Sequence, residues 1–174
     1  MKETGKFFGK YKGTVVFNED PEFRGRLLLN VPDVYGLIPS PWAEPCTPLA
    51  GPTGPEMGVY MVPPIDTPVW VEFEKGDQNK PIWVGCRWGG PQNVPPLALA
   101  GLPISPNILM QSAGQNTIMI SDLPTPAGGI MLKSTLGATI TVNDIAITIQ
   151  NGKGASIVLT ANTVVINEGA LTII

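Results

Sequence analysis

Short stretches in which aliphatic and polar residues alternate fill the last third of the chain, from about residue 116 to residue 174. Period-two alternation rich in Ile, Val and Thr predicts β-strands with one buried face. Within residues 138–150 the phase shifts by one after Asp144, so we expect the aliphatic residues on both sides of it to share a face. The residues predicted to form a buried trimer core are Ile140, Val142, Ile145, Ile147, Ile149, Ile157, Leu159, Val164 and Ile166.

Turn residues interrupt this tract about every eight residues, among them Gly128, Gly137, Gly152 and Gly169. We interpret this spacing as a β-solenoid, in which the chain turns a corner after each short strand. Because the tract has few of the charges that protect sheet edges, a single copy would expose apolar edges and faces. Closed assembly of three chains would cover them. The alternative is half of an ordinary β-sandwich packed on the rest of the chain.

Composition supports an all-β chain. Glycine (20) and proline (19) are frequent, whereas charged residues make up only 14% against a usual quarter. The net charge of −3 and the sequence pI of about 4.9 argue against a general nucleic-acid-binding protein. No signal peptide or membrane-spanning apolar stretch is visible, so we expect assembly in the cytoplasm.

The first half of the chain predicts a small barrel. Expected strands cover residues 10–17, 24–31, 58–62, 68–74 and 81–86. Five short strands with glycine-marked turns are typical of an OB-fold. We therefore divide the chain into an N-terminal arm (1–9), an OB-fold domain (10–89), a proline-rich linker (90–115) and a β-helical needle domain (116–174).

Catalytic and metal-binding patterns are weak. The chain has no histidine to serve as a general base or to activate Cys46 or Cys86. The two cysteines are expected to be buried free thiols, although a disulfide between them stays open. Glu72 and Glu74 share a predicted strand face, but alternating acids of this kind usually serve solvation. We expect no enzyme activity, no cofactor and no metal.

A binding module is the rival interpretation, because OB barrels often bind single-stranded nucleic acid or oligosaccharides through aromatic and basic residues. Here a β-solenoid tail would serve only to oligomerise the module. The candidate binding platform consists of Tyr11, Tyr60, Trp70 and Trp83, with Lys10, Lys12, Arg24 and Arg26 available for phosphates. Alternatively, these aromatic residues form the core of the barrel or contacts between subunits.

Several ordered segments resemble the central spike proteins of contractile tails, the family of phage baseplate assembly protein V and of the type VI secretion spike. In the barrel region these segments are residues 9–15, 24–27, 41–46 (PWAEPC), 58–64 (GVYMVPP), 69–77 (VWVEFEKGD) and 81–85 (PIWVG). Residues 151–157 and 164–171 are similar to the needle of that family. The resemblance implies a homotrimer whose C-terminal tracts wind into an intertwined, triple-stranded β-helix that sheath contraction drives through a target envelope.

The resemblance also implies partners, a virion or injection-particle location and transient contact with a target membrane. Phe7 and Phe8 are expected to face the tail tube or hub. A small PAAR-like tip protein is expected to bind the C-terminal end through Asn167, Leu171, Ile173 and Ile174, because an apolar end needs a cap. The chain lacks the inserted lysozyme-like domain and the iron-binding histidine motif found in some relatives of this kind.

Overall fold

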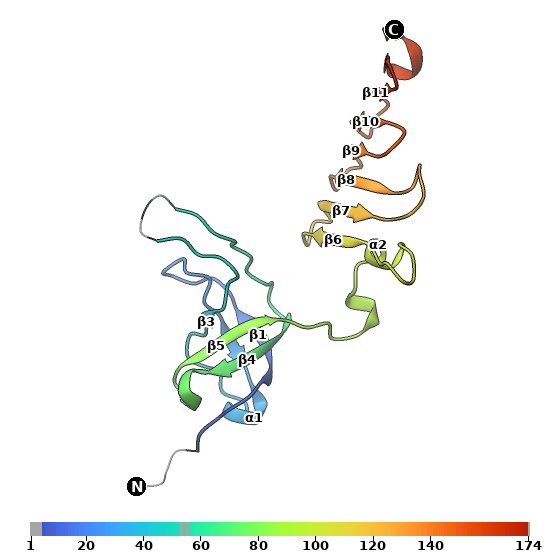
Figure 1. Ribbon diagram of the computed structural model, residues 1–174. Helices are drawn as coiled ribbons and strands as arrows, with labels where there is room; N and C mark the ends of the chain where they lie inside the picture. Colours follow the sequence, from blue (N-terminus) through green and yellow to red (C-terminus); the bar gives the residue numbers. More distant parts are fainter. Residues whose placement is uncertain (1–4, 53, 55, 174) are drawn as a thin grey trace. The chain divides into compact units, whose positions relative to one another are not determined.

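The computed structural model describes residues 5–52, 54 and 56–173 and divides into two compact units, Met1–Gly89 and Gly90–Ile174 (Figure 1). Both units are built mainly from β-strands, which confirms the predicted all-β class. Over the described residues, none of the helices combines the length and apolar character that crossing a bilayer requires.

The first unit is an OB-like half-barrel formed by one five-stranded sheet of order β2-β1-β4-β5-β3. β3 pairs parallel with β5, and the other neighbours are antiparallel. Its elements are β1 (Tyr11–Phe17), β2 (Leu28–Asn30), α1 (Pro32–Tyr35), β3 (Glu44–Pro45), β4 (Pro68–Phe73), the 3-10 helix η1 (Glu74–Gly76) and β5 (Pro81–Cys86).

Alternation in β4 builds the core of this unit as the sequence predicts. Val69 and Val71 are fully buried and Phe73 is 6% exposed, whereas the intervening Trp70 and Glu72 lie on the other face. Glycine is required at position 13 of β1, since a Cβ there would lie 2.8 Å from the Cγ2 atom of Val71. The core consists of Val15, Leu27, Leu29, Val31, Ala43, Val69, Val71, Phe73 and Trp83.

The predicted strand at residues 58–62 is wrong. Only Gly58 forms a bridge there, with Ala50, and the segment pairs with its own preceding arm through Val59 N–H to the Leu49 carbonyl (3.0 Å). The short strand β3, which the sequence analysis missed, takes the edge of the sheet beside β5 instead. Pro63 and Pro64 follow the segment directly and cannot donate to a strand ladder.

The second unit is one eight-stranded antiparallel sheet in sequence order, β6 to β13 (Figure 1). The 3-10 helix η2 (Pro91–Asn93) and helix α2 (Pro96–Leu99) precede it, and η3 (Asn167–Gly169) interrupts it before the last strand. The strands are β6 (Ile108–Gln111), β7 (Thr117–Ser121), β8 (Gly129–Lys133), β9 (Thr139–Val142), β10 (Ile147–Gln150), β11 (Ser156–Thr160), β12 (Thr163–Ile166) and β13 (Leu171–Ile173).

Two expectations about this unit need correction. Consecutive strands pair antiparallel through tight turns, such as Ser134 N–H to the Ala138 carbonyl (2.9 Å), so the turn residues close hairpins and do not make solenoid corners within one chain. The segment 90–115 is also more than a linker, because it contains α2 and strand β6. β6 was missed because Ile108, Leu109 and Met110 are consecutive apolar residues that hide the alternation.

Candidate assembly interface

One face of the eight-stranded sheet carries two parallel columns of aliphatic side chains, because every strand pairs with its neighbours in a register that aligns them. The Ile108 column consists of Ile108, Ile120, Ile130, Val142, Ile147, Leu159, Val164 and Ile173. The Met110 column consists of Met110, Ile118, Leu132, Ile140, Ile149, Ile157, Ile166 and Leu171.

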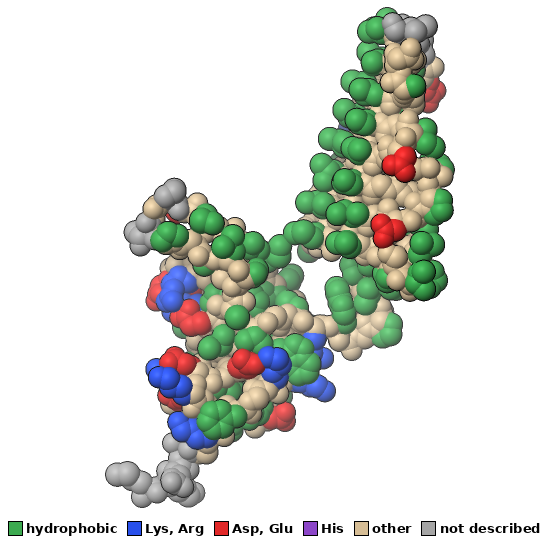
Figure 2. Space-filling model, viewed as in Figure 1, with side chains coloured by type: hydrophobic (Ala, Val, Ile, Leu, Met, Phe, Trp, Pro, Cys, Tyr) green, Lys and Arg blue, Asp and Glu red, His purple; other side chains and the backbone are tan. Residues whose placement is uncertain are grey.

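These columns are open to solvent in a single chain. The exposed large aliphatic residues of the two columns range from 38% exposed at Ile157 to 67% at Ile108, and only Val164 and Ile166 are half-buried. Figure 2 shows the hydrophobic side chains gathered along one side of this unit. An apolar face of this length on a single-layer sheet is an interaction surface, since soluble proteins rarely leave so large a patch uncovered.

Eight of the nine residues predicted for the trimer core lie on this face. Ile145 does not: it sits in the turn between β9 and β10 and is 57% exposed. The turn residue Asn143 explains the difference, because its Oδ1 atom accepts hydrogen bonds from the backbone N–H groups of Ile145 (3.0 Å) and Ala146 (2.9 Å). The strand therefore resumes only at Ile147.

Side chains in the turns tie successive hairpins together. Asn116 Oδ1 accepts a hydrogen bond from the backbone N–H of Thr135 (3.1 Å), and Asn167 Oδ1 accepts one from Ser156 (3.0 Å). The first bond joins two neighbouring turns, and the second joins the η3 turn to the start of β11. The apolar columns are thus presented by a regular framework.

Two of the residues predicted to bind a tip protein lie on the last strand of this sheet, and a third, Asn167, begins η3. Leu171 (52% exposed) and Ile173 (54%) extend the two apolar columns onto β13, which is an edge strand. Asn167 is engaged with Ser156 of its own chain. Ile174 lies outside the described residues.

Of the two phenylalanines predicted to face a hub, one packs on the barrel and the other is exposed. The Phe7 N–H donates to the Gly76 carbonyl (3.0 Å), and its ring packs 5.9 Å from that of Phe73 and 6.1 Å from that of Tyr11. Phe7 therefore anchors the arm on the barrel. Phe8, 69% exposed, is the side chain that remains available for a partner.

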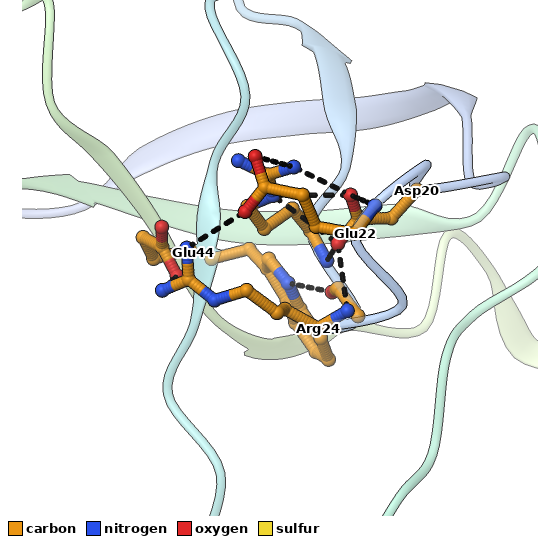
Figure 3. Close-up of polar contacts among 7 residues, drawn as sticks. Asp20, Glu22, Arg24 and Glu44 are labelled. Atoms are coloured by element: carbon orange, nitrogen blue, oxygen red, sulfur yellow. Dashed lines mark hydrogen bonds and ion pairs between the residues drawn. The ribbon is translucent and has the colours of Figure 1, made fainter.

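The basic residues proposed for phosphate binding are mostly neutralised within the barrel. Lys10 pairs with Glu72, and Arg24 pairs with Glu22 (3.3 Å) and Glu44 (2.9 Å) (Figure 3). Arg26 forms a nearly buried pair with Asp20, at 2.7 Å. Because these side chains are already paired with carboxylates, they contribute little positive charge for binding phosphates. This weakens the interpretation of the barrel as a nucleic-acid-binding module.

Asp20 organises the loop that carries these arginines. Its carboxylate, 2% exposed, accepts hydrogen bonds from the backbone N–H groups of Glu22 (3.0 Å), Arg24 (2.9 Å) and Arg26 (3.2 Å). The hydrogen bond from the Arg26 guanidinium, helped by these N–H groups, holds the pKa of Asp20 well below its usual range. This role of Asp20 was not predicted from the sequence, although an Asp in a turn before proline often bonds to nearby backbone.

The aromatic residues do not form one platform. Trp83 is buried in the core and its Nε1–H donates to the Gly25 carbonyl (3.0 Å), while Tyr11 packs on Phe73. Tyr60 is 68% exposed. It lines, together with Trp83, an open and mainly apolar groove of about 860 Å³ beside the 46–62 segment.

The remaining polar candidates are also accounted for within the barrel. Glu72 and Glu74 bind different lysines, Glu74 pairing with Lys80 at 3.7 Å, so they do not form a carboxylate pair. Cys46 and Cys86 are free thiols, but both are exposed, contrary to the expected burial. Across the described part of the chain, no group of three potential metal ligands is found.

Comparison with protein families matches both units. Residues 11–88 match the type VI secretion system/phage-baseplate injector OB domain, and residues 107–172 match the phage baseplate V C-terminal trimerisation domain. A comparison with curated proteins gave no match. The second match begins beside β6 and contains both apolar columns except Ile173.

Proposed function

Since the chain belongs to the baseplate spike family of phage tails and type VI secretion systems, we propose that three copies form the central spike of a contractile injection particle. In this role the spike connects the tail tube or hub to a membrane-piercing tip. The observation that carries the proposal is the double column of exposed aliphatic residues on the sheet of the second unit, which has no second layer among the described residues of that unit. Three such sheets, each turning its columns inward, close into a prism with a dry core.

The closed prism accounts for the apolar face of the sheet. Threefold closure buries the columns of all three chains together and brings the turns of neighbouring chains together at its corners. An intertwined triple-stranded β-helix satisfies these requirements. Eight strands at about 4.8 Å spacing make a prism ~35 Å long, which is stiff but short.

The proposed spike acts mechanically and has no enzyme activity. Support comes from the absence of histidine in the sequence and from the ion pairs that engage Glu72 and Glu74 in the barrel. The single-stranded nucleic-acid or oligosaccharide module stays the weaker alternative, because the groove beside Tyr60 is apolar and Arg24, one of its lining residues, is paired.

Mass measurement of the purified chain in solution tests the assembly. Light scattering coupled to gel filtration is expected to give three chains per particle at micromolar concentration. A stable monomer or dimer at that concentration contradicts the proposal.

We place the tip-binding end at the last strand. Leu171 and Ile173 of three chains present exposed apolar side chains on β13, where a small PAAR-like protein binds, with Asn167 near the rim of this site. Deleting residues 171–174 is expected to leave the trimer intact and to abolish co-purification with the tip protein. Undiminished co-purification of the deletion variant rules this end out as the binding site.

We place the hub at the N-terminal arm, with Phe8 as the contacting side chain. Phe8→Ala is expected to weaken binding to the hub without destabilising the barrel, because Phe8 is exposed. Phe7→Ala is the matched comparison: it removes a ring that packs on Phe73 and is expected to lower the thermal midpoint of the barrel. Equal hub binding by Phe8→Ala and wild type contradicts the assignment.

A further inference from the structure

The charges of the second unit are divided between the two ends of its strands. Because successive strands are antiparallel, the turns form two rows, one at each end of the strands. The lysine row contains the turns at residues 112–116, 134–138, 151–155 and 167–170, and the aspartate row those at 122–128, 143–146 and 161–162.

Both lysines of the unit lie on one row and both aspartates on the other. Lys133 ends β8 and Lys153 lies in the turn after β10, whereas Asp122 follows β7 and Asp144 lies in the turn after β9. The fifth charge, Glu168, lies in the lysine row near the C-terminal end. On the face of this unit that Figure 2 shows, acidic side chains stand singly among uncharged residues.

These four side chains lack ion-pair partners in their own chain, as far as the described residues extend. The barrel differs, because Lys10, Arg24, Arg26 and Lys80 all pair with carboxylates there. Asp144 and Lys153 are exposed, and neither side chain is needed for its turn, which Asn143 and Asn151 hold through backbone hydrogen bonds.

Threefold symmetry makes the two rows complementary. In a ring of three identical chains every contact joins two different surfaces, so one edge of each sheet meets the opposite edge of the next. The lysine row of one chain therefore faces the aspartate row of its neighbour at each corner of the prism.

The spacing along the sheet also matches. Each lysine lies about one strand spacing, ~5 Å, nearer the C-terminal end than its aspartate, whether Lys133 is compared with Asp122 or Lys153 with Asp144. Within each row the two charges are about two and a half spacings apart, ~12 Å. If the strands are tilted so that one end lies one strand spacing higher than the other along the prism axis, Lys133 lies level with Asp122 of the neighbouring chain. The same tilt brings Lys153 level with Asp144.

We propose that ion pairs at the corners of the trimer fix how its sheets align. Lys153 of one protomer pairs with Asp144 of the next, and Lys133 pairs with Asp122. The proposal rests on the trimer proposed above and adds to it the contact that sets which edges meet and at what stagger. The apolar columns stabilise the prism, and the charges select one alignment of its sheets.

Charge reversal in the full-length chain tests the pairing. Asp144→Lys and Lys153→Glu are each expected to raise the trimer dissociation constant about tenfold at low salt, because three surface pairs change together. The double variant Asp144→Lys/Lys153→Glu is expected to return to the wild-type value. High salt is expected to reduce the differences, since these pairs are solvent-exposed.

Glu168→Lys is the matched control. Glu168 belongs to the lysine row, but the turn that it would meet at the same stagger, residues 161–162, is uncharged. This variant is therefore expected to keep the wild-type dissociation constant. Mixing Asp144→Lys chains with Lys153→Glu chains is expected to give mixed trimers by native mass spectrometry, because each variant repels itself and attracts the other.

Two results overturn the pairing while leaving the trimer in place: single reversals that behave like Glu168→Lys at low salt, or a double variant that recovers none of the loss. A wild-type chain that does not trimerise overturns the proposed function, and the pairing with it.

Discussion

Replacing Ile147 by aspartate introduces a charge in the middle of the Ile108 column. Ile147 pairs with Val142 on one side and with Leu159 on the other, so its side chain is surrounded by aliphatic residues along the sheet. In the proposed trimer the three copies converge inside one prism. The variant thus brings three carboxylates into a core that offers them no partner.

The cost of this change follows from the exposure of the side chain. Ile147 is 40% exposed in the single chain, and full burial of an isoleucine contributes about 1.5–3 kcal/mol, so closure of the trimer gains ~1 kcal/mol per chain at this position. An unpaired buried carboxylate costs several kcal/mol more. Three copies together lose roughly 10 kcal/mol, about seven orders of magnitude in the trimer dissociation constant.

Light scattering and thermal unfolding followed by circular dichroism measure the result. We expect Ile147→Asp to be monomeric at concentrations where wild type is trimeric, with the barrel still folded because its core lies wholly in the first unit. Thr148→Asp is the matched control: Thr148 is the next residue of β10 and faces the other side of the sheet. A trimeric Ile147→Asp variant with the wild-type thermal midpoint would refute the inward placement of the columns.

Three further predictions concern the barrel. The fragment Met1–Gly89 is expected to fold as a monomer with buried Trp83, seen as blue-shifted fluorescence; an unfolded fragment would contradict an independent core. Asp20→Asn is expected to destabilise the barrel at neutral pH and to flatten its loss of stability below about pH 4, because the lowered pKa of Asp20 stabilises the fold only while the carboxylate is ionised. Partial desolvation by the surrounding chain raises the pKa of the Cys86 thiol although the residue is exposed, so its alkylation is expected to require a higher pH than that of a free thiol; a rate profile matching free cysteine would contradict this.

The sequence predicted the regular parts of both units well. Alternation located β1, β4 and β5 in the barrel and β7 to β13 in the sheet, because apolar side chains recur at every second position along most of these strands. Eight of the nine residues that it predicted for a trimer core lie on the apolar face of the sheet. The family comparisons confirm the OB and trimerisation domains that the resemblance implied.

The errors arise where local pattern and tertiary pairing disagree. Residues 58–62 have the composition of a strand, yet no neighbour in the main sheet is available for them once β3 occupies its edge. Ile145 continues the alternation in the sequence, but the Asn143 side chain holds it in a turn. Turn rows and their charges could not be assigned without the direction of each strand, which only the structure supplies.

The strict sequential order of β6 to β13 makes the length of the sheet an adjustable quantity. Any two consecutive strands with their two turns return the chain to the same end of the sheet and repeat the same inward-facing pattern. Duplicating such a pair would add about 10 Å to the prism without altering either end or the cross-section. Adding a single strand would exchange the two turn rows beyond it. Spikes of this construction can therefore lengthen in evolution by even numbers of strands, each step leaving the trimer contacts above and below it intact.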